Sequence, residues 1–158
     1  MKSIEELLRT HRFFEGLPNS DLDLLAGCGQ NVVAKAGNYI AREGEAANNF
    51  YVIRQGKIAL ETQGAGRGGV VLETLSEDEV LGWSWLFPPH QWFYDVRVIE
   101  DSRLISMDGV CLRNKAEADP ALGFRLMKTI AREMNERLRE ARLQVLDVYK
   151  LEPPRALE

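Results

Sequence analysis

The feature that most constrains the fold is a series of short apolar runs, separated by turn residues, between residues 31 and 107. The runs are rich in β-branched and aromatic residues, which favour strands. Turn residues such as Gly37-Asn38 and Gln55-Gly56 separate them at close and regular spacing. This rhythm is typical of a β-sandwich, barrel or jelly roll and not of alternating strands and helices. The runs are Val32-Val33, Tyr39-Ile40, Phe50–Ile53, Ile58–Leu60, Val70–Leu72, Val80-Leu81, Val96–Ile99 and Arg103–Met107.

Two short helices are predicted before this β region. Ser3 and Glu6 have the spacing of a capping box, and the helix that they start is expected to stop near Gly16. Asn19-Ser20-Asp21 can cap a second helix, which Gly27 ends. The N-terminal residues therefore predict a helical cap.

A long helix is predicted after the β region, from Asp119-Pro120 to Tyr149, because Pro153-Pro154 forbids its continuation. Apolar residues recur along it with a mean step of about 3.5 residues, which is the coiled-coil period. This stripe either packs on the β region or forms the seam of a homodimer. We expect the seam, because a compact β domain covers only part of a helix roughly 40 Å long. The predicted interface residues are Met127, Ile130, Met134, Leu138, Ala141 and Val145.

Length and charge set bounds on the class of protein. The chain has 158 residues, of which 45% are hydrophobic, and this suits one domain with one core. Its formal net charge of −4 gives no overall attraction to nucleic acid, although the sequence does not exclude a local basic patch. The sequence contains neither a signal-peptide h-region nor an apolar run long enough to span a membrane, so we expect a cytoplasmic protein.

Cys28 and Cys111 lie far apart in the sequence and belong to no CxxC or Cys/His pattern. A zinc site or a cysteine-ligated iron–sulfur cluster therefore lacks local ligands. We expect two buried, reduced thiols and no metal site. The sequence identifies no cofactor.

An aromatic stretch, residues 80–98, gathers all three tryptophans of the chain beside Gly82 and a Pro88-Pro89 break. Its aromatic side chains carry too much apolar surface to lie in water. They therefore either pack a core or line a pocket built into one. The sequence leaves both alternatives open.

Residues 44–58, GEAANNFYVIRQGKI, resemble the central hairpin of the cyclic-nucleotide-binding domain family, as found in Crp/Fnr-type bacterial regulators. The order of the other segments also fits, with residues 80–86 at the position of the family's phosphate-binding cassette. The resemblance implies a mainly β fold with helices: a double-stranded, jelly-roll-like β-roll with a helical cap and a long C-terminal dimerisation helix. We expect a single domain over residues 1–158, with the cap in residues 1–30, the β-roll in residues 31–110 and the helix in residues 119–150.

The cassette departs from the family pattern at both polar anchors. In the family a Gly is followed by a Glu that binds the ribose, and an Arg roughly ten residues later pairs with the cyclic phosphate. Here Trp83 follows Gly82, and Trp92 stands at the Arg position, or Phe93 if the loop is one residue longer. A phosphate buried without these anchors would lose its water uncompensated, so we do not expect cyclic AMP to bind in the usual way. The predicted ligand-binding residues are Gly82, Trp83, Ser84, Trp85, Trp92, Phe93, Tyr94 and Arg97.

Three other patterns have weaker functional interpretations. The GxGxxG at Gly64–Gly69 precedes a strand and not a helix, which favours a flexible hairpin loop over a phosphate site. His90 and His11 are candidate haem or metal ligands, but ordinary solvated histidines are more common. Asp95 and Arg97 share a strand face, where they either pair or offer the pocket a charge.

These observations support three functional hypotheses. The leading one is a stand-alone Crp/Fnr-like regulatory or sensor domain, a homodimer that recognises an apolar or aromatic small molecule, or a partner protein, through residues 80–98. The alternatives are a true cyclic-nucleotide receptor with a rearranged cassette and a ligand-free module for dimerisation and protein interaction. No catalytic set of side chains is visible, so we expect a non-enzyme. We also expect no membrane contact and no direct DNA binding, since no helix-turn-helix follows the long helix.

Overall fold

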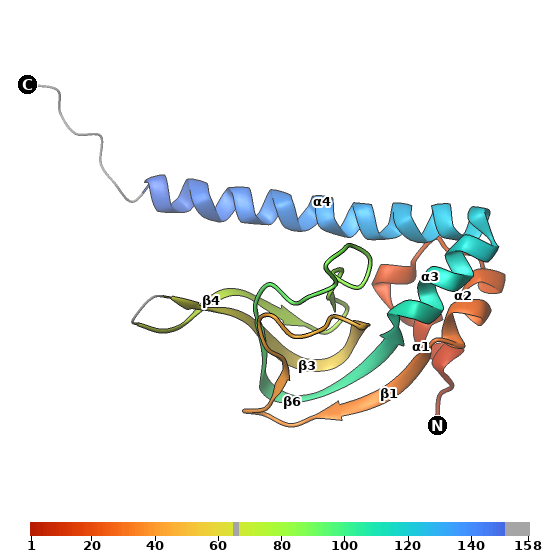
Figure 1. The fold of residues 1–158 in the computed structure, drawn as a ribbon, viewed down its shortest axis with the longest axis horizontal. Coiled ribbons are helices and arrows are strands. Elements are labelled where there is room, and N and C mark those ends of the chain that lie inside the picture. Colours follow the sequence, from red (N-terminus) through yellow and green to blue (C-terminus); the bar gives the residue numbers. More distant parts are fainter. Residues whose placement is uncertain (65–66, 151–158) are drawn as a thin grey trace, which may run out of the picture.

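The computed structural model describes residues 1–64 and 67–150. A helical cap is followed by an antiparallel β-roll and then by two helices, the second of them long (Figure 1). The helices are α1 (Ile4–Thr10), the 3-10 helix η1 (Arg12–Phe14), α2 (Asn19–Ala26), α3 (Gly109–Ala118) and α4 (Pro120–Lys150). The strands are β1 (Gly29–Ala34), β2 (Tyr39–Ala41), β3 (Asn49–Gly64), β4 (Arg67–Ser76), β5 (Val80–Leu81) and β6 (Asp95–Asp108).

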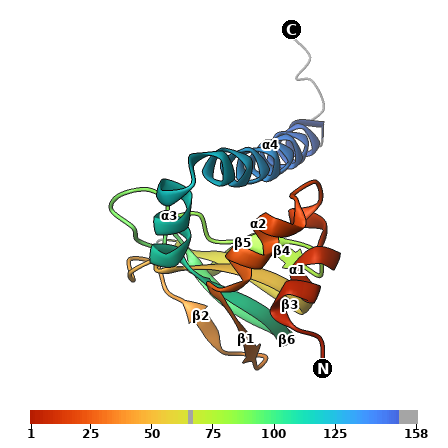
Figure 2. The ribbon, with the colours of Figure 1, turned by 90° about the vertical axis from the view of Figure 1, so that its right-hand side faces the viewer.

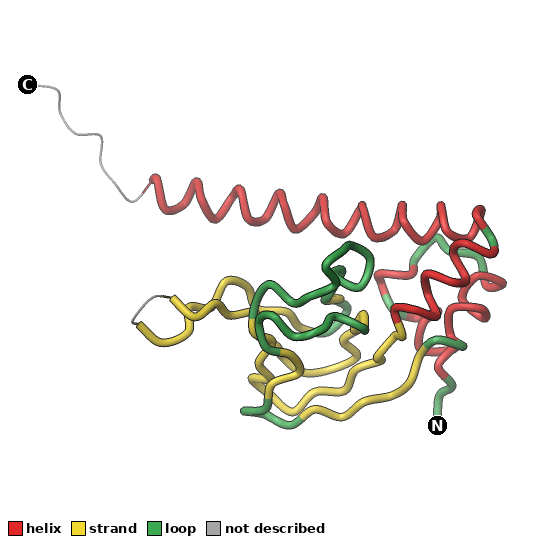
Figure 3. Tube along the Cα trace, viewed as in Figure 1, coloured by secondary structure: helices red, strands yellow, loops and turns green. Residues whose placement is uncertain are grey.

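The strands pair in the order β1-β6-β3-β4, with β2 added to β6 and β5 added to β3, and these pairings are antiparallel. The sheet curls, and α4 lies across its open side, with the cap and α3 gathered at the N-terminal end of α4 (Figures 1 and 2). Figure 3 shows that the helices and the strands occupy separate parts of the molecule. The mainly β fold with a helical cap and a long last helix, predicted from the sequence, is confirmed.

The turn predicted at Gln55-Gly56 is wrong, because these residues lie inside β3, where the pairing with β6 shifts its register. Gly56 has a φ of 106°, and a Cβ at this position would lie 2.7 Å from the Cα of Ser102 on β6. Glycine permits this close approach of two backbones. The bulge joins the predicted runs Phe50–Ile53 and Ile58–Leu60 into one bent strand, which curls the sheet into a roll.

The helical cap begins as the sequence predicts. Ser3 and Glu6 form a complete capping box: the Ser3 Oγ accepts the N–H of Glu6 at 3.2 Å, and the Glu6 carboxylate accepts the N–H of Ser3 at 2.9 Å. The predicted extension of this helix to Gly16 is wrong, because α1 ends at Thr10. The chain instead turns at His11 into the short helix η1.

His11 fastens the cap to the β-roll. Its buried ring accepts the backbone N–H of Phe13 at Nδ1, at 3.2 Å, so the ring hydrogen lies on Nε2, which donates to the Ile53 carbonyl at 3.1 Å. Burial lowers the pKa of His11 below its ordinary value of 6.5, because a charged ring would lose its hydration, and the bond to Ile53 opposes this only in part. Both ring nitrogens are therefore used within the protein.

The sequence analysis missed α3. Asp108 starts this helix, since its carboxylate accepts the N–H of Cys111 at 2.7 Å. Gly109 follows because a Cβ there would lie 2.8 Å from the Cβ of Trp85. Within α3 the buried residues are Gly109 and Leu112 alone, so the helix lacks the apolar stripe by which helices are recognised in a sequence.

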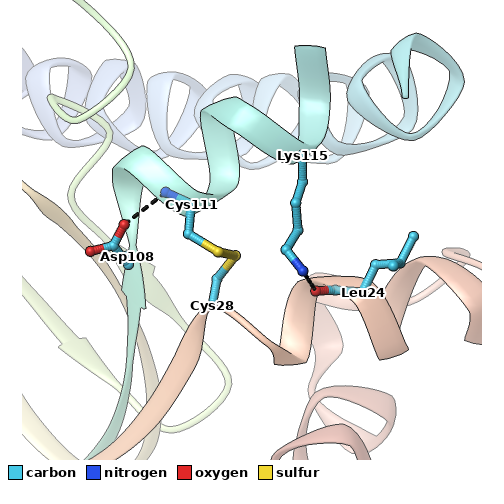
Figure 4. The surroundings of a disulfide bond; sticks show 5 residues. All are labelled: Leu24, Cys28, Asp108, Cys111 and Lys115. Carbon is cyan, nitrogen blue, oxygen red and sulfur yellow. Dashed lines mark hydrogen bonds between the residues drawn. A yellow bond between two sulfur atoms is a disulfide. The ribbon is translucent and has the colours of Figure 1, made fainter. Parts of the chain in front are cut away.

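Cys28 and Cys111 form a disulfide, so the prediction of two reduced thiols is wrong in this structure (Figure 4). Cys28 immediately precedes β1 and Cys111 lies just after β6, and the pairing of Gly29 with Met107 places both cysteines at the same end of one ladder. Their Cα atoms are 5.6 Å apart although 83 residues separate them along the chain. Local spacing cannot reveal such a pair.

The buried apolar side chains form two clusters. One lies among the cap, α3 and the first half of α4 and includes Trp85 and Phe50, whereas the other fills the β-roll and includes Trp92. The three-dimensional fold thus directs neighbouring tryptophans of the aromatic stretch into different cores. Among the described residues, no helix combines the length and the apolar character needed to cross a bilayer.

The surroundings of α4 change along its length. In its first half Leu126 and Ile130 are buried in the core of their own chain, with 3% and 2% of their surface exposed. Further along, Met134 and Leu138 are 36% and 50% exposed. Ile130, predicted as an interface residue, is therefore a core residue of its own chain, because it lies one turn after Leu126 on the face that packs against the cap.

The environment of His11 predicts a pH-dependent stability. Because the folded pKa is lowered, the unfolded chain takes up a proton first, so stability is full above pH 6.5 and falls as the pH drops toward the folded pKa. Urea denaturation at pH 7.5 and pH 5.5 should show a lower free energy of unfolding at the acidic pH. The His11→Asn variant should lose this difference, whereas His90→Gln should keep it. Equal pH dependence in the His11→Asn variant and the unchanged protein would contradict this assignment.

Candidate functional site

The aromatic stretch forms β5, a loop and the start of β6. The turn at residues 44–47 holds the end of this loop through three backbone hydrogen bonds: Gly44 N–H to Trp92 O at 2.8 Å, Trp92 N–H to Glu45 O at 2.9 Å and Ala47 N–H to His90 O at 2.7 Å. The loop is thus tied to the hairpin that carries the family resemblance. A further contact lies within the loop itself, where the Nδ1 of His90 is 3.2 Å from the Ser84 carbonyl.

Trp92 fills the interior of the β-roll. Its side chain is 4% exposed and lies between the rings of Tyr51 and Tyr94, with centroid distances of 6.2 and 6.3 Å. Gly82 makes room for it, since a Cβ on Gly82 would lie 2.6 Å from the Trp92 ring. Trp92, one of the two residues that the sequence analysis offered for the cassette Arg position, is thus an apolar side chain packed in a core.

Trp85 and Trp83 point to different surroundings. Trp85 is 1% exposed and packs against Phe50 and the cap, and its carbonyl accepts a hydrogen bond from Arg113 of α3. Trp83 is half-buried, with the Arg137 guanidinium 4.7 Å above its ring. Of the three tryptophans, only Trp83 therefore lies at the boundary between the β-roll and α4.

Arg137 of α4 is a residue of the candidate site that the sequence analysis missed. Its side chain is 11% exposed, and its Nη2 donates to the Val80 carbonyl of β5. Its Nε lies 3.4 Å from Glu133 and 3.8 Å from Glu73. It also stacks on Trp83, a cation–π contact. The i,i+4 spacing of Glu133 and Arg137 was visible in the sequence, but it is equally typical of a solvated helix face.

Two carboxylates beside Arg137 are poorly hydrated. Burial raises the pKa of Glu73, and the Arg137 charge lowers it only in part. Burial likewise raises the pKa of Glu133, against the opposing charges of Arg137 and Arg12. The Arg137 guanidinium is thus a counter-charge that these two carboxylates share.

A cleft of about 670 Å³ separates β4 from α4 at this point. It is bordered by a smaller recess of about 390 Å³ that reaches Met134 and Leu138, so the cleft opens toward the exposed apolar side of α4. Its charged residues are three glutamates and Arg137, which makes its walls predominantly negative. The lining residues are Leu60, Val71, Leu72, Glu73, Thr74, Glu79, Tyr94, Arg137, Glu140, Ala141 and Gln144.

Six of the eight predicted ligand-binding residues line neither this cleft nor its recess, among them Phe93, Ser84 and Arg97. Phe93 is 67% exposed, on the outside of the roll, and Ser84 is half-buried in the loop. Arg97 is bound to the buried Glu61, with Nη2 2.5 Å from the carboxylate. Only Tyr94 and Trp83 of the predicted set lie against the cleft or its recess.

Asp95 and Arg97 do not pair with each other. The buried Asp95 carboxylate accepts the N–H of Glu43 at 2.8 Å and the Gln63 amide at 2.9 Å, and Arg42 lies 3.3 Å away. These hydrogen bonds, with the Glu43 backbone bond first, lower the pKa of Asp95. The period-two spacing predicts that Asp95 and Arg97 share a strand face, but each binds a partner on another strand or turn.

Within residues 1–64 and 67–150, no group of three or more His, Cys, Asp or Glu side chains is arranged to hold a metal ion. The GxGxxG pattern connects β3 to β4, as a hairpin loop would, and its residues 65 and 66 lie outside the described part of the chain.

The fold and the site define a β-roll domain closed by a C-terminal helix. The family model for the cyclic nucleotide-binding domain matches residues 31–119. The chain belongs to this family.

Similar proteins include regulators and nucleotide-binding domains. The chain is 24% identical over 131 residues to the CRP-like cAMP-activated global transcriptional regulator of Mycobacterium tuberculosis; the match covers 83% of this chain and 58% of the regulator. A putative cyclic nucleotide-binding protein from Geobacter metallireducens superimposes with a TM-score of 0.76 at 25% identity, over 87% of this chain and 99% of that chain. A cyclic nucleotide-binding domain from Methylobacillus flagellatus gives 0.78 at 14% identity, over 98% and 85%. The chain thus spans less than two thirds of the regulator.

Removing the Arg137 guanidinium should destabilise the protein. The Arg137→Met variant keeps the apolar stem but leaves the Val80 carbonyl without its donor and removes a counter-charge from Glu133 and Glu73, at a cost of about 3 kcal/mol in the free energy of unfolding. Because both carboxylates can then be neutralised by protons, the loss should be smaller at pH 5 than at pH 8. Urea denaturation measures both quantities. The exposed Arg139→Met is the matched control, and an equal effect of the two variants would contradict this role of Arg137.

Proposed function

We propose that the chain is a non-enzymatic regulatory domain that acts as a homodimer and does not bind cyclic AMP in the usual way, because its own side chains occupy the nucleotide site. The observation that carries this proposal is the position of Trp92. The residue that stands at the cassette Arg is buried in the core of the roll and is held there by Tyr51, Tyr94 and the gap at Gly82. A phosphate partner is replaced by packed apolar surface.

The charges around the cleft support the same proposal. The arginines nearest to the site already have partners: Arg97 binds Glu61, Arg42 lies beside Asp95, and Arg137 bridges Val80, Glu73 and Glu133. An anionic ligand would have to break one of these contacts and would meet an excess of glutamates. The alternative of a true cyclic-nucleotide receptor with a rearranged cassette therefore lacks an available phosphate partner.

Isothermal calorimetry tests this proposal directly. Loss of a buried, charge-assisted phosphate contact costs on the order of 2–5 kcal/mol, or roughly 30- to 4,000-fold in affinity. Cyclic AMP and cyclic GMP should therefore bind weakly or not at all. Base stacking on Trp83 could restore about 1–3 kcal/mol of binding free energy, and this gain sets the upper limit of the expected affinity. A dissociation constant in the micromolar range or tighter would reject the proposal.

The second half of α4 supports the homodimer. On the side that faces the roll, α4 becomes polar after Ile130, with Glu133 and Arg137 in ion pairs. The apolar stripe has by then turned away from the roll, and Met134, Leu138 and Val145 are 36–53% exposed. A second copy of this helix would cover the stripe and close the recess beside the cleft. We therefore propose Met134, Leu138, Ala141 and Val145 as the seam, with Met127 at its edge.

Two matched substitutions test the seam. Leu138→Asp should dissociate the homodimer without unfolding it, because Leu138 is 50% exposed in the single chain and would carry an unpaired charge into the interface. Leu143→Asp is the control, since Leu143 is 60% exposed but lies about 140° around the helix, at about 100° per residue. Light scattering should report a monomer only for Leu138→Asp. A monomeric unchanged protein, or equal masses for the two variants, would contradict the seam.

A second candidate function is binding of a small molecule in the cleft. Its volume of about 670 Å³ suits a small ligand, and Leu60 and Tyr94 supply apolar and aromatic contacts among the glutamates. We propose that such a ligand would be an uncharged or cationic aromatic compound. Native mass spectrometry of freshly purified protein distinguishes this sensor from a ligand-free dimerisation module through the presence or absence of a bound mass.

We also propose that this domain acts through protein partners in the cytoplasm and makes no direct contact with DNA. The name of the mycobacterial relative, a transcriptional regulator, supports the location. The net charge of −4 opposes binding to phosphates. A salt-sensitive complex with duplex DNA at submicromolar protein, measured by anisotropy, would reject the second part.

A further inference from the structure

The disulfide lies at the junction of the cap, the β-roll and α3. Cys28 connects α2 to β1, and Cys111 is in the first turn of α3 (Figure 4). Two hydrogen bonds accompany the covalent link: the N–H of Asp108 donates to the Cys28 carbonyl at 2.8 Å, and Lys115 Nζ donates to the Leu24 carbonyl at 2.6 Å. The end of α2 is therefore fastened to α3 by one covalent and two polar links.

The same junction holds the first turns of α4. A Cβ on Gly123 of α4 would lie 2.7 Å from the Ala116 carbonyl of α3, so the two helices are in close contact. Arg125 of α4 binds the buried Asp21 of α2 through two hydrogen bonds of 2.5 and 2.8 Å. The disulfide thus joins the segment that directly follows α2 to α3, and the first half of α4 rests on these two helices.

The disulfide can be approached from solvent. Cys28 itself is 7% exposed, but it lines a polar cleft of about 240 Å³, together with Gln30, Asn49 and Asp108 among others. Cys111 is half-buried, in the first turn of a ten-residue helix, where backbone N–H groups stabilise a negative charge. Cys28 thus borders a cleft that a reductant can enter, and the Cys111 sulfur lies where a departing thiolate is stabilised.

We propose that Cys28 and Cys111 form a redox-responsive pair that controls how firmly α4 is held. A dithiol reductant in the cleft attacks the Cys28 sulfur as a thiolate and forms a mixed disulfide, and the electron pair of the broken bond leaves on the Cys111 sulfur. The second thiol of the reductant then attacks the mixed disulfide, releases Cys28 and closes the reductant's own disulfide. Two electrons pass to the protein, and both cysteines end as thiols after protonation.

The consequence for α4 rests on the proposed function in one respect, that α4 is the element through which the domain acts on a partner. Opening the disulfide removes the covalent link between α2 and α3 and leaves the polar contacts, so the junction loosens and does not unfold. A disulfide in a reducing compartment forms only under oxidation and commonly has a sensing role. The oxidised form then holds α4 firmly, and the reduced form releases it.

A redox titration tests whether the pair responds at all. The intact protein is equilibrated with mixtures of reduced and oxidised glutathione. Its free thiols are then alkylated, and the mass of the protein is measured by mass spectrometry. The proposal predicts one reversible transition in which both cysteines gain or lose their alkyl groups together. A disulfide that resists a large excess of reduced glutathione in the native protein would be a structural staple, and thiols that do not pair under excess oxidised glutathione would exclude the disulfide. Either result overturns the proposal.

Hydrogen exchange tests the link to α4. Reduction should speed amide exchange in α3 and in the first turns of α4, and the double variant Cys28→Ser, Cys111→Ser should exchange like the reduced protein with or without reductant. Exchange in β3 should stay unchanged and serves as the internal reference. Equal exchange of α4 in the two redox states would overturn its control by the pair. Light scattering and nucleotide calorimetry on the oxidised protein report separately on the proposed function.

A charge substitution tests the chemistry of the opening step. Asp108→Asn keeps the helix cap but removes the negative charge beside the N–H of Cys111, so the departing thiolate is repelled less and reduction should proceed roughly two- to fivefold faster. Glu117→Gln removes the same charge from the far end of α3 and should leave the rate unchanged. An unchanged rate in Asp108→Asn would overturn the assignment of Cys111 as the leaving sulfur.

Discussion

The contact between Arg137 and the Val80 carbonyl decides how α4 lies on the β-roll. Up to Ile130 the helix is held by apolar packing, but beyond that point its roll-facing side is charged, and Arg137 links it to the roll. The buried guanidinium donates through Nη2 to the Val80 carbonyl, while its Nε has the nearby charges of Glu133 and Glu73 but no hydrogen-bond partner among the described residues. This contact lies where the cleft, Trp83 and the exposed apolar stripe of α4 meet.

The interior of the roll is filled by the protein's own side chains. A β-roll that has lost its ligand would carry a cavity, and cavities in packed cores are costly. Trp92 fills that volume with its own ring, and Gly82 gives it the room. In the function that we propose, the replacement of the phosphate partner by Trp92 thus also stabilises the fold without a ligand. If the domain still responds to a signal, the structure offers the cleft under α4 and the cysteine junction at its base.

The sequence predicts those features that depend on neighbouring residues. The capping box of Ser3 and Glu6, the strand rhythm and the long helix could all be read from local patterns. The features that it misses depend on contacts between distant residues. Arg137 meets Val80 from 57 positions away, and its surroundings on the helix look like an ordinary charged face. Cys28 reaches Cys111 only through the β1–β6 ladder.

Two further differences between prediction and structure have a common cause. Gly56 looks like a turn in the sequence, but the neighbouring strand makes it a bulge. Ile130 has the spacing of a dimer seam, yet the cap covers it first. In both cases the local sequence is compatible with two environments, and tertiary packing selects one of them. The aromatic stretch behaves in the same way, because its spacing cannot show that Trp85 and Trp92 enter different cores while Phe93 stays in solvent.

The most direct test of the central claim is a crystal structure of the protein grown with a large excess of cyclic AMP. The account predicts that Trp92 remains inside the roll, that Arg137 remains on the Val80 carbonyl, and that no nucleotide lies between α4 and the β-roll. A cyclic nucleotide seated there, with its phosphate bound by Arg137 and with Trp92 displaced from the core, would contradict it.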